Sequence, residues 1–154
     1  MSVRRRRREE LGPYLEHRAY LRVRFQDVDS IHVVWHGHYI SYFEFGREAF
    51  GEEYGLGYQD VRAAGLVAPV VHVSCDYLQP ARFGDELTVV TRLHATDRAV
   101  VELSYEVRRG SDESLLATGR TRQVFTDHEG ALILNQPEIM RLFYAQWEDQ
   151  LIQP

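Results

Sequence analysis

The strongest constraint on the fold is a helical pattern with a broad apolar face. Between residues 36 and 54, apolar residues recur at intervals of four, three and four, at Tyr39, Phe43, Gly46 and Phe50. Residues at this spacing share one side of a helix. The face is widened by Ile40, Tyr42 and Phe45. A helix with so wide an apolar face must be covered by other structure, so we expect it to be largely buried.

Strand patterns lie on both sides of this helix. Before it, Leu21, Val23 and Phe25 alternate with arginines, as in a strand with one buried face. After it, the same alternation appears in residues 71–77, 87–93, 101–107 and 115–125. Short turns, such as the one over residues 109–112, separate these segments. The four later strands can therefore form an antiparallel meander.

A second helix is predicted near the C-terminal end. Asn135 can cap it, and Pro137 suits its first turn. Its apolar side consists of Ile139, Leu142, Phe143 and Trp147. The order of strand, helix, four strands and helix predicts an α+β fold, in which an antiparallel five-stranded sheet wraps around the long helix.

The length of the chain fits a single domain. It has 154 residues, of which 44% are hydrophobic and 27% are charged, as in ordinary globular proteins. Five consecutive arginines, Arg4 to Arg8, stand near the start. We expect residues 1–18 to form a flexible basic tail and residues 19–154 to form one domain.

Charge and composition exclude several classes of protein. The net charge of −5 argues against nucleic-acid binding by the protein body, because such binding depends on neutralising phosphates. No stretch approaches the roughly 18 apolar residues of a membrane helix, and no signal-peptide pattern is present, so we expect a cytoplasmic protein without membrane insertion. The single cysteine, Cys75, cannot form an internal disulfide, and its strand position predicts a core thiol.

The candidate chemistry lies between the first strand and the long helix. Residues 27–39 read Asp-Val-Asp-Ser-Ile-His-Val-Val-Trp-His-Gly-His-Tyr. A carboxylate at Asp29 could attack an electrophile or act as a base for water. The free N–H groups of the helix, at or about His36, could bind negative charge that develops on an oxygen. Alternatively, Asp29 is a turn residue that binds local amides, the role that we expect for Asp27.

This segment resembles the signature of the 4-hydroxybenzoyl-CoA thioesterase family, including its bacterial branch associated with the Tol-Pal envelope system. The residues that carry the resemblance are Phe25, Asp27, Asp29, Val33, Val34, Trp35, His36, His38 and Tyr39, with the later segments 42–44, 69–71, 75–77 and 83–85 and with Arg47. It covers about Tyr20 to Gly130. The family usually has glycine where this chain has His32, and asparagine where it has His38.

The resemblance implies a hot-dog fold and the hydrolysis of an acyl-CoA thioester to a free acid and CoA, without a cofactor. It implies catalytic roles for Asp29 and for His36, through its backbone N–H or its imidazole. Substrate-binding positions are implied at Trp35, Gly37, His38, Tyr39, Glu44, Ala68 and Pro69. It also implies a homo-oligomer, a dimer or a tetramer, whose sites draw residues from two subunits.

Other interpretations of the same residues stay open. The histidines at 32, 36 and 38 suggest a metal site, but His32 precedes the helix and no matching ligand pair follows, so we expect no metal. Glu44 could instead form a helix ion pair, and His72 could lie at a surface or an interface. The fold also hosts enzymes that act on acyl carrier protein thioesters and acyl-CoA binders without turnover. Arginines that could bind CoA phosphates are Arg82, Arg92, Arg98, Arg108, Arg109, Arg120 and Arg122.

Overall fold

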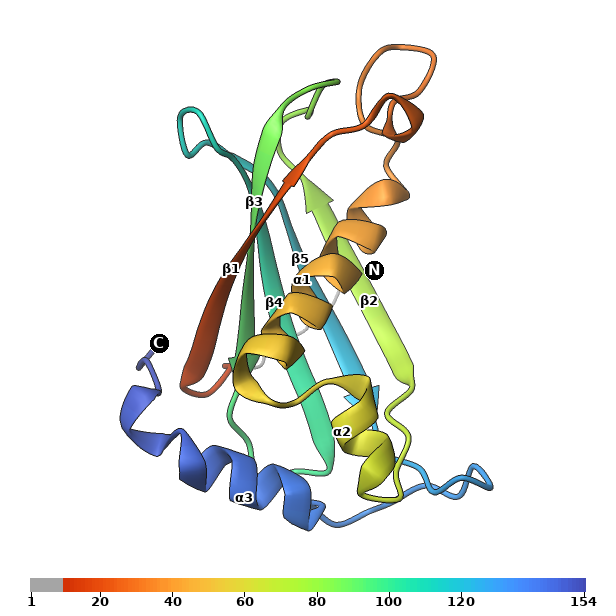
Figure 1. Ribbon diagram of the computed structural model, residues 1–154, viewed down its shortest axis with the longest axis vertical. Coiled ribbons are helices and arrows are strands. Elements are labelled where there is room, and N and C mark those ends of the chain that lie inside the picture. The colour runs from red at the N-terminus through yellow and green to blue at the C-terminus, as the bar shows by residue number, and fades with distance from the viewer. Residues whose placement is uncertain (1–9) are drawn as a thin grey trace, which may run out of the picture.

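The computed structural model describes residues 10–154 as one curved antiparallel sheet around a long helix, which confirms the α+β prediction (Figure 1). The strands are β1 (Tyr14–Arg22), β2 (Val70–Tyr77), β3 (Glu86–His94), β4 (Val100–Arg109) and β5 (Leu115–Val124). The helices are α1 (His38–Tyr54), α2 (Tyr58–Ala63) and α3 (Glu138–Gln146), with short 3-10 turns η1 (Phe25–Asp27) and η2 (Glu148–Gln150). The arginine run at residues 4–8 lies outside the described residues.

The long helix packs against the concave face of the sheet, as its apolar pattern predicts. Phe43 and Phe50 are completely buried, and the Phe43 ring stacks on Tyr105 of β4 with 4.7 Å between ring centroids. Gly46 permits the close approach, because a Cβ at this position would overlap Thr91 and Val89 of β3. The apolar face is narrower than predicted, since the Phe45 side chain is exposed.

The strand order is β1-β3-β4-β5-β2, so the predicted meander of four strands is wrong at its first member. β3, β4 and β5 do form a meander, but β2 pairs with β5, placing Cys75 opposite Gly119. The reason is the intervening α1 and α2, which carry the chain across the concave face to the far edge of the sheet (Figure 1). An alternating pattern identifies the two faces of a strand but not its neighbours.

The first strand is longer at its start and shorter at its end than predicted. β1 begins at Tyr14, so residues 14–18 pair with β3 and do not belong to a tail. The strand ends at Arg22, and Phe25 lies in η1 with 79% of its surface exposed. The start was missed because Glu16 and Arg18 make this stretch polar, although Leu15 and Ala19 on either side of them are buried.

The C-terminal helix also differs in detail from the prediction. Its N-cap residue is Pro137 and not Asn135, and the residues that it buries are Met140 and Phe143. Leu142 points outward and is 53% exposed. Ile139, Phe143 and Trp147 do pack against the core as predicted, so only Leu142 departs from the predicted face.

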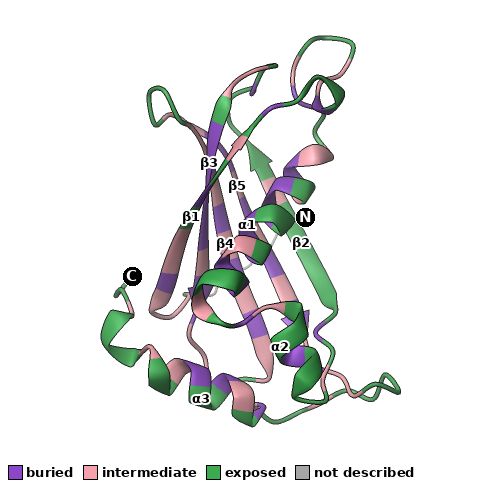
Figure 2. Cartoon of the chain, viewed as in Figure 1, coloured by how far each residue is buried: buried purple, intermediate pink, exposed green. Residues whose placement is uncertain are grey.

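One edge of the sheet lacks a cover within the described chain. β2 is exposed along nearly its whole length, unlike the purple and pink strands beside it (Figure 2). α1 lies over β1, β3 and β4, which leaves Val71 and Val73 of β2 at 56% and 40% exposure. Among residues 10–154, no helix is both long enough and apolar enough to cross a membrane.

Candidate active site

Asp29 opens a tight loop that returns the chain toward α1. The Asp29 N–H donates to the Val33 carbonyl at 2.8 Å, and the His32 N–H donates to the Asp29 carbonyl at 3.0 Å. The Asp29 carboxylate accepts the Ile31 N–H through Oδ1 at 2.9 Å. Asp29 thus has the predicted turn contact, but one carboxylate oxygen remains for other partners. The half-buried carboxylate is held by its own loop.

His32 closes this loop in an unusual backbone conformation. Its φ is 66°, in the left-handed region that favours glycine. Three-residue hairpin loops commonly need such a residue after a turn, and glycine supplies it with little strain. This conformation is a physical reason to expect glycine at this position, as the sequence resemblance implies.

We expect His32→Gly to raise the free energy of unfolding by about 0.5–1 kcal/mol. The gain from removing left-handed strain exceeds the entropic cost of a more flexible unfolded chain. Urea denaturation would measure the difference. Ser30→Gly is the matched control, because Ser30 lies in the same loop without a positive φ, and it should lose stability. Loss of stability in both variants would contradict the strain at His32.

Asp27 has a structural role beneath the candidate site, as predicted. It is 1% exposed and accepts hydrogen bonds from the Arg24 N–H at 2.9 Å and from the Tyr42 hydroxyl at 3.2 Å. The Arg24 guanidinium also lies 3.3 Å from its other oxygen. Burial opposes ionisation, but these donors and the Arg24 charge outweigh it and lower the pKa of Asp27.

We expect Asp27→Asn to destabilise the protein by about 1–3 kcal/mol at pH 7, because charged hydrogen bonds are lost in a buried place. The pKa of Asp27 is depressed in the folded state, so its contribution is present above the unfolded pKa of about 4 and is lost as pH falls through the folded value. Denaturation at pH 7, 5 and 3 should show the difference from wild type shrinking. Asp97→Asn, at an exposed position, should change little; a constant difference across pH would contradict the argument.

Backbone N–H groups are free where α1 begins. The Trp35 N–H donates to the Asp27 carbonyl and the His38 N–H donates to the Trp35 carbonyl, both at 2.9 Å. Between them, the N–H groups of His36 and Gly37 have no hydrogen-bond partner within residues 10–154. The helix starts at His38, two residues later than predicted, so these amides precede its first turn. They can donate to an oxygen that acquires negative charge, and the helix dipole favours such charge there.

Gly37 has a steric role at this point. The Trp35 ring packs against the imidazoles of His36 and His38, with centroids 4.9 Å and 5.4 Å away. A Cβ at Gly37 would overlap the Trp35 ring. Any larger residue would therefore displace the indole from the free amides.

A cavity of about 360 Å³ joins the carboxylate to the start of the helix. Its walls include Asp29, Ile31, Val33, Val34, His36, Tyr39, Tyr77, Leu78, Gln79 and Pro80. The structure thus brings together three of the predicted residues: Asp29, His36 and Tyr39. Tyr77 and Leu78 come from the end of β2 and its following loop, which sequence reasoning did not assign to the site. Their signal was slight, since they read as the end of an ordinary strand.

Trp35, Gly37 and His38 lie just before or at the start of α1 but do not line the cavity, and Glu44, Ala68 and Pro69 form a second group away from Asp29. Glu44 is exposed, and its carboxylate accepts a hydrogen bond from the Tyr58 hydroxyl at 3.1 Å. Burial of the Tyr58 hydroxyl and the nearby Glu44 charge raise the pKa of Tyr58 to about 12. Ala68 and Pro69 precede β2, roughly 30 Å of extended strand from Tyr77. One subunit alone therefore does not gather all the predicted positions around Asp29.

A buried arginine links the parts of this second group. Arg47 is 2% exposed, lies 5.2 Å from the Tyr58 ring centre and donates to the Leu56 carbonyl at 2.8 Å. Its Nε reaches the Gln123 side chain at 3.5 Å, and the Gln123 amide donates to the Ala68 carbonyl. Glu44 forms no ion pair with Arg47 among the described residues, so the predicted helix ion pair is absent there.

The candidate CoA-binding arginines fall into two classes. Arg92, Arg108, Arg109 and Arg122 form ion pairs with carboxylates of the sheet or its turns. Arg82, Arg98 and Arg120 have no ion pair within the described chain. Of these, Arg82 stands nearest the candidate site, because its backbone forms a bridge with Val33. It is the arginine best placed to meet a phosphate outside the cavity.

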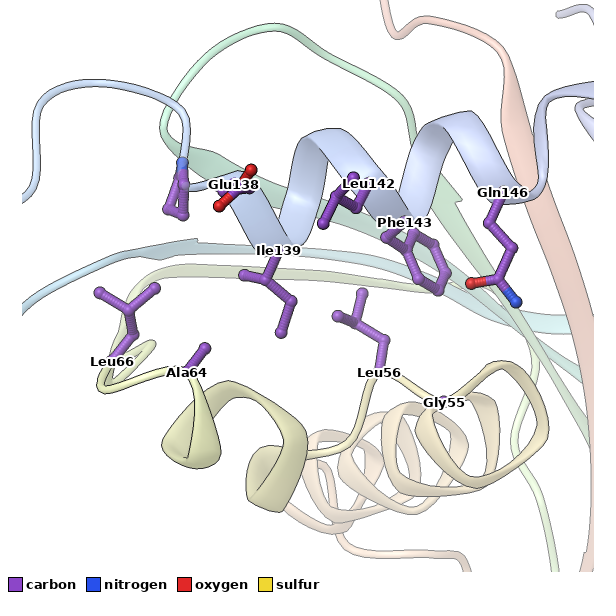
Figure 3. A pocket seen from close by; sticks show the side chains of 10 residues that line it. Gly55, Leu56, Ala64, Leu66, Glu138, Ile139, Leu142, Phe143 and Gln146 are labelled. Atoms are coloured by element: carbon purple, nitrogen blue, oxygen red, sulfur yellow. The ribbon is translucent and has the colours of Figure 1, made fainter.

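Two other features bear on alternatives. Within residues 10–154, no cluster of three or more His, Cys, Asp and Glu side chains is arranged to hold a metal ion. A separate hollow of about 490 Å³ lies between α2 and α3, with Leu56, Ala64 and Leu66 facing Ile139 and Phe143 (Figure 3). It contains none of the predicted site residues. Glu138 is its one ionisable side chain, so it offers little chemistry.

Comparison with known proteins gives the family. The model of a family described as the thioesterase-like superfamily matches residues 23–143, which include the Asp29 loop and the whole sheet after β1. The chain belongs to the thioesterase-like superfamily. The hot-dog fold expected from the sequence is confirmed by this match and by the solved structures that resemble it.

Three known proteins illustrate the similarity. A putative acyl-CoA thioesterase of Bacillus subtilis is 31% identical over 71 residues, 46% of this chain and 51% of the relative, so the match spans about half of that protein. A hypothetical protein of Thermus thermophilus is 33% identical, with TM-score 0.73, over 86% of this chain and 97% of that one. The fold is shared with a 1,4-dihydroxy-2-naphthoyl-CoA thioesterase of Synechocystis, which is 21% identical. Its TM-score is 0.72, and the match covers 86% of this chain and 98% of that one.

Proposed function

We propose that the protein hydrolyses acyl-CoA thioesters to a free acid and CoA. The observation that carries this proposal is the cavity that Asp29 and His36 both line just before α1, where the backbone N–H groups of His36 and of the adjacent Gly37 are free. Hydrolysis of a thioester requires few catalytic groups beyond these, because the thioester carbonyl is reactive and the thiolate is a good leaving group. The names of related proteins, among them a putative acyl-CoA thioesterase, support the same reaction class.

In the proposed reaction, the amides bind the thioester oxygen while Asp29 acts on the carbonyl carbon. As a base, Asp29 takes a proton from water, the hydroxide adds to the carbon, and the C–S bond breaks to release CoA thiolate. As a nucleophile, it forms an acyl anhydride that water then hydrolyses. Both routes use the carboxylate in its ionised form. The developing oxyanion is stabilised by donors that are already in place.

The site is proposed to be completed by a second subunit. β2 is the last strand of the sheet, so its outer edge has no neighbouring strand within the described chain, and its apolar residues are exposed. Such edges are commonly paired with another strand or buried. Two copies that pair edge to edge about a two-fold axis have antiparallel strands. The start of β2, with Pro69, then lies beside the end of the partner's β2, with Tyr77. This arrangement brings the second group of predicted residues to the carboxylate.

The specificity of the reaction belongs to the same proposal. The sequence resemblance favours the 4-hydroxybenzoyl-CoA branch, and a related hydrolase acts on 1,4-dihydroxy-2-naphthoyl-CoA. A chloroplast acyl-acyl carrier protein thioesterase of Arabidopsis thaliana, 24% identical over 113 residues, makes carrier-protein thioesters the second candidate. Arg82 beside the cavity suits a phosphate of either carrier.

The test is release of free thiol from a panel of substrates. Short, long and aromatic acyl-CoAs, including 4-hydroxybenzoyl-CoA, are compared with acyl carrier protein thioesters of the same acyl groups. Release of thiol from acyl-CoA supports the proposal, and a strong preference for the carrier protein supports the second candidate. Binding of acyl-CoA without thiol release would instead identify a non-catalytic acyl-CoA-binding protein.

A further inference from the structure

The hydroxyl of Tyr77 is bound to the backbone just before α1. Tyr77 Oη donates to the His36 carbonyl oxygen at 2.7 Å. Its ring meets Tyr39 edge-on, with centroids 5.2 Å apart and planes at 88°, which restricts how the ring can turn. Tyr77 is the last residue of β2, whereas His36 belongs to the loop that enters the helix. One side chain therefore ties the edge of the sheet to the loop.

This hydrogen bond acts on the peptide group that carries a free amide. The His36 carbonyl and the Gly37 N–H belong to the same planar peptide and point in opposite directions. Holding the oxygen fixes the plane and hence the direction in which the Gly37 N–H donates. The preceding and following N–H groups, of Trp35 and His38, are already bound to backbone carbonyls. Tyr77 thus fixes the peptide between these two anchors.

The hydroxyl remains a donor under all conditions in which the protein would work. Burial and the neighbouring Cys75 thiol raise the pKa of Tyr77 to about 12. A carbonyl oxygen can only accept, so the direction of the hydrogen bond is fixed. The contact does not depend on the protonation state of His36.

We propose that Tyr77 is a positioning residue that holds the peptide between His36 and Gly37, and with it the free amides before α1, in place for the thioester oxygen. The inference rests on the proposed function for its chemical consequence, but not for the contact itself. Tyr77 acts through the peptide group and not on the reacting atoms. Removing only its hydroxyl should therefore weaken transition-state binding more than substrate binding.

The first test is Tyr77→Phe, which keeps the ring and removes the donor. We expect kcat to fall roughly tenfold with KM changed by less than about twofold, a smaller loss than that of removing an oxyanion donor altogether. Tyr20→Phe is the matched control, because Tyr20 is 73% exposed on β1 and its loss should leave both constants unchanged. An increase in KM at constant kcat would overturn the proposal and show that the hydroxyl contacts substrate.

A second measurement does not depend on turnover. In amide relaxation experiments, Gly37 should have an order parameter of about 0.85 in the wild type and below about 0.6 in Tyr77→Phe, with the middle of α1 unchanged. An equal order parameter in both proteins would overturn the positioning role, whatever the activity. If the wild type releases no thiol from any substrate, the proposed function is overturned. The amide relaxation experiment would still decide whether Tyr77 holds the Gly37 amide.

Discussion

Asp29→Asn is expected to lower kcat for thioester hydrolysis by about 1,000-fold or more. Asparagine has nearly the same shape, and its side-chain oxygen can still accept the Ile31 N–H, so the loop should persist. What is lost is the negative charge that attacks the carbonyl or takes a proton from water. A group with either role contributes several orders of magnitude to the rate. Free thiol release under saturating substrate measures the change.

The control for this variant is Asp97→Asn, which removes an exposed carboxylate from a turn far from the cavity. Its activity should match the wild type, and both variants should retain wild-type unfolding midpoints. Turnover within threefold of wild type in Asp29→Asn would remove Asp29 from the mechanism. A single turnover in ¹⁸O-labelled water can then identify the nucleophilic route: label in the peptide that contains Asp29 requires an anhydride that water opened at the Asp29 carbonyl, because a base does not exchange its own oxygens.

The second large effect is expected from charges on the uncovered face of β2. The double variant Val71→Lys/Val73→Lys should raise the dissociation constant of the homo-oligomer more than about a hundredfold. Each valine that is buried contributes about 1.5–3 kcal/mol, and in the proposed pairing the two-fold axis passes near residue 73, where the lysine faces its own copy. Sedimentation velocity measures the association, and thiol release should fall with the loss of the oligomer.

Leu134→Lys is the comparison for the double variant. Leu134 is 78% exposed and lies in the segment between β5 and α3. It should neither dissociate the protein nor alter turnover. A Val71→Lys/Val73→Lys protein that stays associated would refute pairing through β2. A dissociated but fully active one would show that each subunit holds a complete site.

Sequence reasoning succeeded where the information is local. The long helix follows from a spacing within one turn, and the loop at Asp29 lies where the pattern changes from strand to helix. The order of strands was predicted wrongly because pairing of β2 with β5 depends on the path of α1 and α2, which no alternation of residues encodes. The tail boundary failed for a related reason. Polar residues of β1 face outward and conceal the strand.

The candidate site shows the same limit. Asp29, His36 and Tyr39 are near one another in the chain, and they line one cavity. Tyr77 was missed because its role depends on a contact across 41 positions of the chain. Ala68 was predicted by resemblance, but its carbonyl is held by Gln123, a residue that no motif singles out. Such partners are visible only when the sheet has formed.

The compact loop at Asp29 also has an evolutionary consequence. The carboxylate, its supporting amide and the strained residue at 32 all lie within five consecutive positions, so few other residues constrain them. One part of the cavity wall, in contrast, comes from the end of β2 and the loop after it. Under the proposed function, mutations in that part would alter which acyl group fits without disturbing the carboxylate. Lineages with this loop could then exchange one acyl substrate for another and keep the same chemistry.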